Sequence, residues 1–379
     1  MIEPLPPHGR LNELTAIRGV AALMVVLFHA RGSWHPIFGS GEWASMLIAS
    51  GWMWVHFFFV LSGFVMMQAY GSDFVRRVDG RAYWQFIVTR FGRIYPLHFF
   101  TLCVMAALWS AGVIEVVNPA GSFGSSVLLT QGFTYVPLVW NAPAWSISTE
   151  WYTYLLFPLL VPILMRLSPR VTRLAWIAFA AVVVWFFTDS DAATNWPLGR
   201  LVLCVVEFAL GCATHRLVTT RAWPLMRRGW ATCLCMAPIV LLALPQMFSS
   251  VWLQAVVAVG FALSIGIVAA EKTLIDAALN SRLLQFLGVI SYSVYLDHEI
   301  LYSVARAVAD ASWGRPHALH DLPTPLALAL FVIYMGVLIV VSWVTWRWIE
   351  EPLRGWFKHK ARGGRRVEPI AAVDAAEIK

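Results

Sequence analysis

Charged residues are scarce in this sequence. Asp, Glu, Lys and Arg make up 13% of its 379 residues, whereas hydrophobic residues make up 59%. Soluble globular domains average about 25% charged and about 45–50% apolar residues. The composition therefore argues against a soluble protein and favours one embedded in a membrane.

Cysteine is also rare, and the sequence lacks a ligand set for a metal. Cys233 and Cys235 form a C-x-C motif, but no second pair or nearby histidine completes a zinc site. All five cysteines lie in apolar segments, where free thiols usually behave as small hydrophobic residues. We therefore expect buried thiols and no bound metal.

Ten apolar segments are long enough to cross a bilayer as helices. They are predicted near 12–31, 51–70, 94–112, 143–165, 174–188, 198–215, 231–247, 250–270, 284–306 and 324–347. Most of the 28 Lys and Arg fall in alternate loops, the pattern of cytoplasmic loops. This distribution explains the net charge of +7 better than a nucleic-acid partner does.

The sequence thus predicts an all-α polytopic protein of the inner cell membrane, with about ten transmembrane helices and both termini cytoplasmic. Residues 1–355 would form one membrane-embedded domain, whose last helix stops at Pro352. Residues 356–379 would form a basic, disordered cytoplasmic tail near anionic membrane lipids.

Arg18 and His29 are the first candidate site residues. They lie eleven residues apart in the first segment, which places them about 20° apart around a helix and about 16 Å along it. Ionisable side chains are costly in a membrane and usually functional. A snorkelling arginine and a hydrogen-bonded histidine are the structural alternative. The functional interpretation is a site reached from both membrane faces, with His29 as general base.

Arg90 and Arg93 are three residues apart at the predicted start of the third helix, so they share a face. They can serve as ordinary cytoplasmic anchors. With Arg18 at the same predicted depth, they can also clamp phosphates, because guanidinium groups bind phosphate oxygens in bidentate pairs.

Glu150 lies about two turns into the fourth segment, at the end where His29 is expected. Its carboxylate can orient His29, stabilise the imidazolium or bind an acceptor hydroxyl, or it can be only a buried hydrogen-bond partner. Trp145, at the start of the same segment, can stack on a sugar ring or belong to the interfacial aromatic belt.

A second polar cluster interrupts the ninth segment. It contains Tyr292, Tyr295, His298 and Glu299, and it is too polar to face lipid. We interpret Tyr292, Tyr295 and His298 as substrate-binding residues. The alternative is that these residues only pack helices together.

Together these segments resemble the membrane-bound acyltransferase 3 family of bacterial O-acyltransferases. The resemblance covers residues 12–355 and rests on five motifs in order: Arg18 with His29, FFFVLSGFVM at 57–66, Arg90 with Arg93, WSISTE at 145–150 and SYSVYLDH at 291–298. It implies a ten-helix protein that transfers an acyl group, most often acetyl, from cytosolic acyl-CoA to a hydroxyl of an extracytoplasmic or lipid-linked saccharide.

The resemblance also implies roles for single residues. His29 matches the catalytic histidine, Arg18, Arg90 and Arg93 match the donor-binding arginines, and Glu150 matches the carboxylate after the Trp-Ser motif. Two positions depart from the family, which often has an acidic residue at His56 and a second glutamate at Trp151. These departures concern the acceptor pocket more than the donor site.

Two other functions remain open from the sequence. A proton-coupled transporter or flippase would use Arg18, His29, Glu150 and Glu299 as a proton relay. A structural subunit of a polysaccharide export assembly would need none of them. Partners in the acyltransferase case are the saccharide acceptor, membrane lipids and proteins of polysaccharide biosynthesis or export. No region matches the esterase-like domain that some family members carry.

Overall fold

The computed structural model describes residues 11–38, 43–75, 77–133, 140–189, 198–220, 222–223, 226–247, 249–314 and 316–362. Over these ranges the chain forms helices and no β-strand. The longer helices are α1 (Leu11–Ala30), α4 (Trp54–Phe74), α5 (Gly80–Ser110), α7 (Trp145–Arg166), α8 (Pro169–Thr188), α9 (Gly199–Thr219), α10 (Arg228–Leu242), α11 (Val251–Ala270), α13 (Arg282–Trp313), α14 (Thr324–Thr345) and α15 (Glu351–Ala361). Short helices lie between them: α2 (His35–Phe38), α3 (Trp43–Ala49), α6 (Pro119–Val127) and α12 (Asp276–Leu279).

All ten predicted spans are helical, and eight of these helices in the described part of the chain are long and apolar enough to cross a membrane. The two that fall short are α10, with only 15 residues, and α13, which is long but polar. The prediction of an all-α polytopic membrane protein is confirmed. The orientation of the termini stays a prediction.

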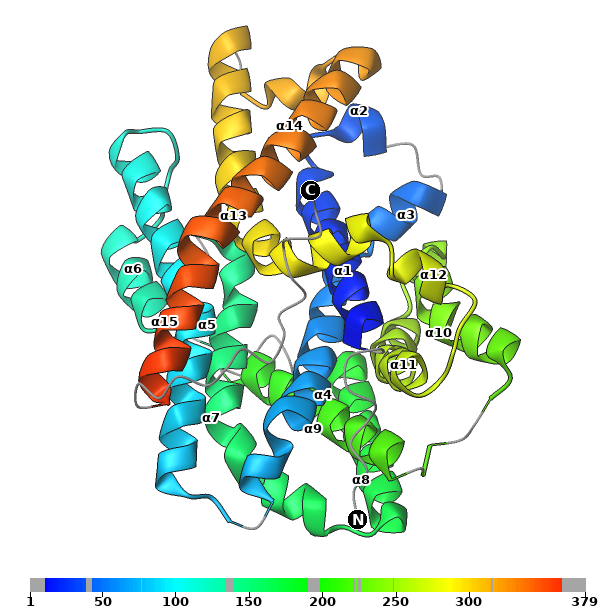
Figure 1. The fold of residues 1–379 in the computed structure, drawn as a ribbon. Coiled ribbons are helices and arrows are strands. Elements are labelled where there is room, and N and C mark those ends of the chain that lie inside the picture. Colours follow the sequence, from blue (N-terminus) through cyan, green and yellow to red (C-terminus); the bar gives the residue numbers. More distant parts are fainter. Residues whose placement is uncertain are drawn as a thin grey trace.

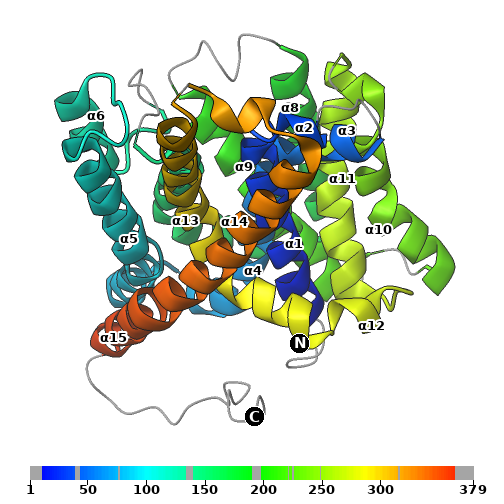
Figure 2. The same ribbon diagram turned by 90° about the horizontal axis from the view of Figure 1, so that it is seen from above.

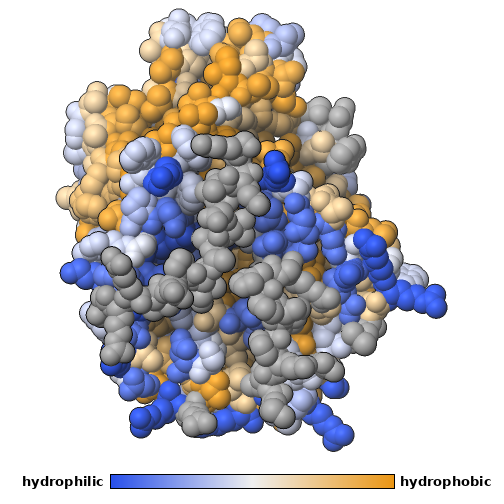
Figure 3. All heavy atoms as spheres, viewed as in Figure 1, coloured by the Kyte–Doolittle hydropathy of each residue, from blue (hydrophilic) through white to orange (hydrophobic). Residues whose placement is uncertain are grey.

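Helix α1 lies in the middle of the bundle, with α4 and α13 beside it (Figures 1 and 2). In Figure 1, α5 and α7 lie on one side of the bundle, and α10 and α11 lie on the other. In the view of Figure 3, hydrophobic side chains cover α13 and α14, whereas hydrophilic side chains gather over the lower half.

Two glycines bring α1 and α13 into backbone contact. A Cβ atom on Gly19 would lie 2.6 Å from the Gly288 nitrogen, and one on Gly288 would lie 2.1 Å from the Thr15 carbonyl oxygen. Small residues at a helix crossing allow this close approach in a membrane, where van der Waals packing replaces much of the hydrophobic driving force. Because α1 and α13 cross so closely, Arg18 and His29 lie directly beside α13.

The predicted start of the third span was wrong. Helix α5 begins at Gly80, where the Asp79 carboxylate caps it by accepting a hydrogen bond from the Ala82 amide. Arg90 and Arg93 therefore lie about 15 and 20 Å along the helix rather than at its start. The two arginines face the interior of the bundle, whereas the sequence placed them at the start of the helix.

The predicted helix end at Pro352 was also wrong. After α14 the chain passes through a π-helical turn, Trp346–Glu350, and continues as α15. Pro352 occupies a first-turn position of α15, where its missing N–H costs little. Helices α14 and α15 form one arm that crosses the bundle and packs on α5 (Figure 1). The predicted domain boundary at 355 falls inside α15, and residues 363–379 of the predicted tail lie outside the described residues.

Candidate active site

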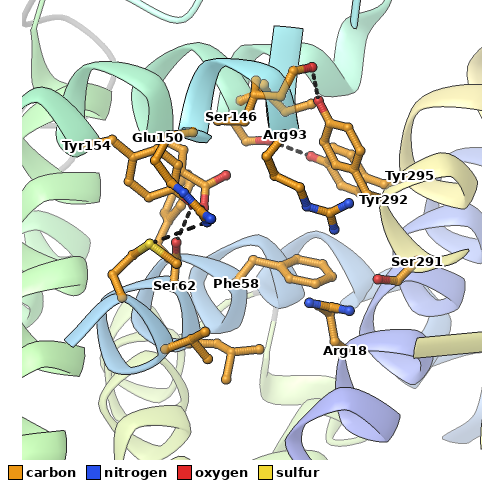
Figure 4. Close-up of a pocket in the computed structure, with 17 residues that line it drawn as sticks. Arg18, Phe58, Ser62, Arg93, Ser146, Glu150, Tyr154, Ser291, Tyr292 and Tyr295 are labelled. Carbon is orange, nitrogen blue, oxygen red and sulfur yellow. Dashed lines mark hydrogen bonds between the residues drawn. The ribbon is translucent and has the colours of Figure 1, made fainter. Parts of the chain in front are cut away.

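A cavity of about 180 Å³ lies between α1, α4, α5, α7 and α13 (Figure 4). Its wall contains three cations, one carboxylate, three phenols and several serines and apolar residues. The lining residues with polar side chains are Arg18, Arg90, Arg93, Glu150, Tyr154, Tyr292, Tyr295, Ser62, Ser146 and Ser291. We call this space the arginine cavity. It brings together the three arginines that the sequence placed in one site.

Arg18 is held by a backbone carbonyl rather than by a carboxylate. Its Nη2 and Nε donate to the Gly288 oxygen at 2.7 and 3.3 Å. The glycine crossing of α1 and α13 exposes this carbonyl to the guanidinium. Among the described residues, no carboxylate forms an ion pair with Arg18 in the cavity wall.

Arg90 is held by an aromatic hydroxyl. Its Nη2 donates to the Tyr70 hydroxyl at 2.8 Å, and its guanidinium carbon lies 4.9 Å from the centre of the same ring. Among the described residues, no acceptor pairs with the buried Nε–H of Arg90. An unpaired buried donor is rare in folded proteins and fits a site for an anionic ligand.

Arg93 forms an ion pair with Glu350 and lies over the Tyr292 ring, 5.1 Å from its centre. In Figure 4 its guanidinium points across the cavity toward Arg18. Nothing in the sequence connects Arg93 with Glu350, because Glu350 belongs to a segment expected to end the last helix.

Glu150 lies in the arginine cavity and not at His29. Its Oε1 accepts a hydrogen bond of 2.7 Å from the Tyr154 hydroxyl, which in turn is 2.8 Å from Ser62 Oγ. Within the described part of the chain, no hydrogen bond joins Glu150 to His29. The expected orienting role for His29 therefore does not fit this arrangement, and Glu150 instead lines the same cavity as the three arginines.

His298 takes the place beside His29 that the sequence proposed for Glu150. The two rings are 5.1 Å apart, and His298 Nε2 lies 3.3 Å from His29 Nδ1. His298 Nδ1 is 3.2 Å from the Val294 oxygen, and His29 Nδ1 is 2.9 Å from the Val25 oxygen.

These contacts select one tautomer for each histidine. Carbonyl oxygens only accept, so Nδ1 of each ring carries the proton. His298 Nε2 is then an acceptor that shares the His29 Nδ1–H with Val25. The free lone pair of His29 lies on Nε2, which suits a general base.

The tyrosines connect the two regions. Tyr295 lines the arginine cavity, and its ring is 6.1 Å from that of His298. Its hydroxyl bonds to Ser146 and Pro143, while that of Tyr292 donates to the Ile94 oxygen. Trp145 lies outside the cavity lining, with the Arg200 guanidinium 5.4 Å from its ring centre.

A family model described as an acyltransferase domain, that of acyltransferase 3, matches residues 11–347. The chain belongs to the acyltransferase 3 family.

Relatives with curated names agree with this membership. Acyltransferase MdmB of Streptomyces mycarofaciens is 29% identical over 382 residues, which cover 92% of this chain and 93% of the relative. Protein 2 in the picA locus of Rhizobium radiobacter is 39% identical over 162 residues, 38% of this chain and 78% of the relative. The putative peptidoglycan O-acetyltransferase YrhL of Bacillus subtilis is 21% identical over 403 residues, 92% of this chain and 55% of the relative. No solved structure gave a significant match.

Membership of the acyltransferase 3 family decides between the functions left open by the sequence. The protein is a multi-pass membrane O-acyltransferase rather than a transporter or a structural subunit. The absence of a bound metal stays a prediction, although no group of three metal-ligating side chains occurs among the residues described.

Sequence reasoning missed several residues of this candidate site. Tyr70 and Tyr154 were not singled out because an isolated tyrosine in an apolar helix is common. Glu350 could have been recognised as a candidate for an ion pair, because a glutamate directly after a long apolar run must be either exposed or paired.

Proposed function

We propose that this acyltransferase moves an acyl group, acetyl by default, from cytosolic acyl-CoA to a hydroxyl of an extracytoplasmic or lipid-linked saccharide in the inner membrane. The observation that carries the proposal is that Tyr295, in the wall of the arginine-lined cavity, and His298, 6.1 Å from its ring, connect this cavity to His29, which lies outside the cavity lining. The cavity suits an anionic donor, and His29 suits proton transfer from a hydroxyl.

The chemistry of the arginine cavity fits a CoA phosphate or pyrophosphate. Arg18 and Arg90 have no carboxylate partner among the described residues, and Arg90 Nε lacks any acceptor there. The cavity is smaller than the roughly 300–1,000 Å³ typical of ligand pockets. We therefore expect it to enclose part of the donor, with closure around the rest on binding.

His29 carries the proposed acyl transfer. Its Nε2 takes the proton of the acceptor hydroxyl while the oxygen attacks the thioester carbonyl. The carbon–sulfur bond then breaks, and the imidazolium returns the proton to the CoA sulfur. In the alternative route, Nε2 itself attacks the thioester carbonyl and CoA leaves as the thiolate. The acceptor hydroxyl then attacks the acyl-histidine and frees His29, and the hydroxyl proton ends on the CoA sulfur. His298 fixes the His29 ring in either route.

The sequence predicts substrate-binding roles for Trp145, Tyr292, Tyr295 and His298. Because the two tyrosine hydroxyls already bond to protein atoms, we assign their rings to the walls of the donor cavity. Trp145 remains the candidate for stacking on a sugar, since it is partly exposed.

The test is acetyl-CoA turnover by the purified protein in nanodiscs, with and without saccharide acceptors, for wild type and His29→Ala. We expect CoA release in the wild type and none above background in the variant. Rapid-quench trapping under turnover would distinguish the routes, since an acyl-histidine forms only in the second. Donor turnover that persists in His29→Ala would refute the proposed role of His29.

A further inference from the structure

The carboxylate of Glu350 lies behind the wall of the arginine cavity. Its side chain is 1% exposed and is not among the lining residues, whereas the Arg93 side chain is 18% exposed and lines the cavity. Glu350 therefore cannot contact a donor in the cavity directly. Any effect that it has on the donor passes through Arg93.

The two oxygens of this carboxylate are held by different helices. Oε1 pairs with Arg93 Nη1 on α5, and Oε2 accepts a hydrogen bond of 2.9 Å from Ser293 on α13. Ser293 directly follows Tyr292, whose ring lies beneath the Arg93 guanidinium. The carboxylate thus joins α5, α13 and the α14–α15 arm at one point.

The α14–α15 arm is fitted against α5 next to Arg93. A Cβ atom on Gly92 would lie 2.2 Å from the Phe357 Cβ, so only glycine permits this contact. The Phe357 ring also lies 5.6 Å from the Phe91 ring. The π-helical turn that ends at Glu350 then aims the carboxylate at the adjacent Arg93. π-Turns of this kind frequently occur at functional sites.

We propose that Glu350 is a positioning residue that fixes the Arg93 guanidinium in the cavity wall, with its remaining N–H groups directed at the acyl donor. The proposal rests on the proposed function, because it takes the donor to occupy the arginine cavity. Only Nη1 of Arg93 is engaged by Glu350, and a guanidinium has five N–H donors. The ion pair also lowers the mutual repulsion of the three cations that line the cavity.

The test measures acetyl-CoA affinity and turnover in nanodiscs for Glu350→Gln, with Glu351→Gln as the matched control. Glu351 is the next residue, is partly exposed and pairs with Arg354 on the surface. For Glu350→Gln we expect the Kd and the KM for acetyl-CoA to rise about tenfold, the effect of one charge-assisted contact. We expect kcat at saturating donor to stay within about twofold, and Glu351→Gln to change neither constant.

Two further variants make the result specific. In an Arg93→Ala background, Glu350→Gln should have no additional effect on Kd, because the two residues act as a unit. Ser293→Ala removes only the hydrogen bond to Oε2 and should raise Kd by about two- to threefold. If Glu350→Gln does not fold, the Kd of Ser293→Ala provides the test of the positioning role.

Three results would overturn the positioning role. The first is a lower melting temperature with unchanged Kd in Glu350→Gln or Ser293→Ala, which means a structural role. The second is a lower Kd, which means that the carboxylate competes with the donor. The third is no acetyl-CoA binding by the wild type, which overturns the proposed donor site as well.

Discussion

The arginine cavity and the histidine pair, His29 with His298, share the helices α1 and α13 but hold their side chains in different ways. The three arginines are held by three kinds of group: a backbone carbonyl, a phenol and a carboxylate. The two histidines are each bonded to a carbonyl one turn earlier in their own helix and to one another.

This difference separates two tasks. The cavity keeps positive charge away from water, which strengthens its attraction for an anion. The histidine pair carries no fixed charge and presents a lone pair at a defined position. Helices α1 and α13 contribute Arg18 and Gly288 to one region, and His29 and His298 to the other. Binding and proton transfer are therefore expected to respond to different substitutions.

His29→Ala should have the largest effect. Removing the base is expected to lower kcat by about 10²- to 10⁴-fold with little change in the Kd for acetyl-CoA. The measurement is CoA release in nanodiscs beside a binding titration. His35→Ala is the control, because His35 is an exposed histidine that stacks on His320 away from the cavity. An equal loss in both variants would contradict a specific role for His29.

His298→Ala should have the second-largest effect. Without His298, the His29 ring stays in place but its orientation is no longer fixed. The kcat is therefore expected to fall by about 10- to 100-fold. The KM for the acceptor should change little. A variant with normal kcat and a raised acceptor KM would instead restore the substrate-binding role that the sequence suggested for His298.

Arg18→Ala and Arg90→Ala should act on the other region. Each is expected to raise the KM for acetyl-CoA by about tenfold or more, because each removes a charge-assisted contact to the donor. Steady-state kinetics at varied acetyl-CoA concentration provide the measurement, with exposed Arg173→Ala as control. A fall in kcat without a change in KM would argue that the arginines act on the reaction step.

Gly288→Ala tests the helix crossing that both regions share. The added methyl group would overlap the Thr15 carbonyl and push α1 from α13, at a cost of about 1–3 kcal/mol in stability. Thermal unfolding of the purified protein measures this. Gly336→Ala, where a Cβ meets no atom within 4 Å, should be neutral or slightly stabilising. Equal melting temperatures for the two variants would count against the close crossing.

Much of the fold was predictable because apolar length and loop charge are local properties of the sequence. Two errors came from single residues. Pro352 was expected to end a helix, but a π-helical turn before it lets the helix continue. Residues 80–89 were left outside the predicted spans, yet the Asp79 cap starts a helix there.

The candidate site was predictable in its members but not in its pairings. Helical spacing placed Arg18 and His29 on one face, and both do contact α13. Spacing within one helix gives no information about which distant helix supplies a partner. For that reason Glu150 was expected at His29 and Glu350 was not connected with Arg93, whereas tertiary packing joins Glu150 to Tyr154 and Glu350 to Arg93.

The division between donor binding and proton transfer is tested most directly by titrating acetyl-CoA against His29→Ala and Arg18→Ala in nanodiscs, each beside its turnover at saturating donor. Our account predicts that His29→Ala binds like the wild type without turnover. It predicts that Arg18→Ala binds at least about tenfold more weakly yet retains most of its kcat. Equal loss of binding in both variants would contradict it, because the two regions would then form one site.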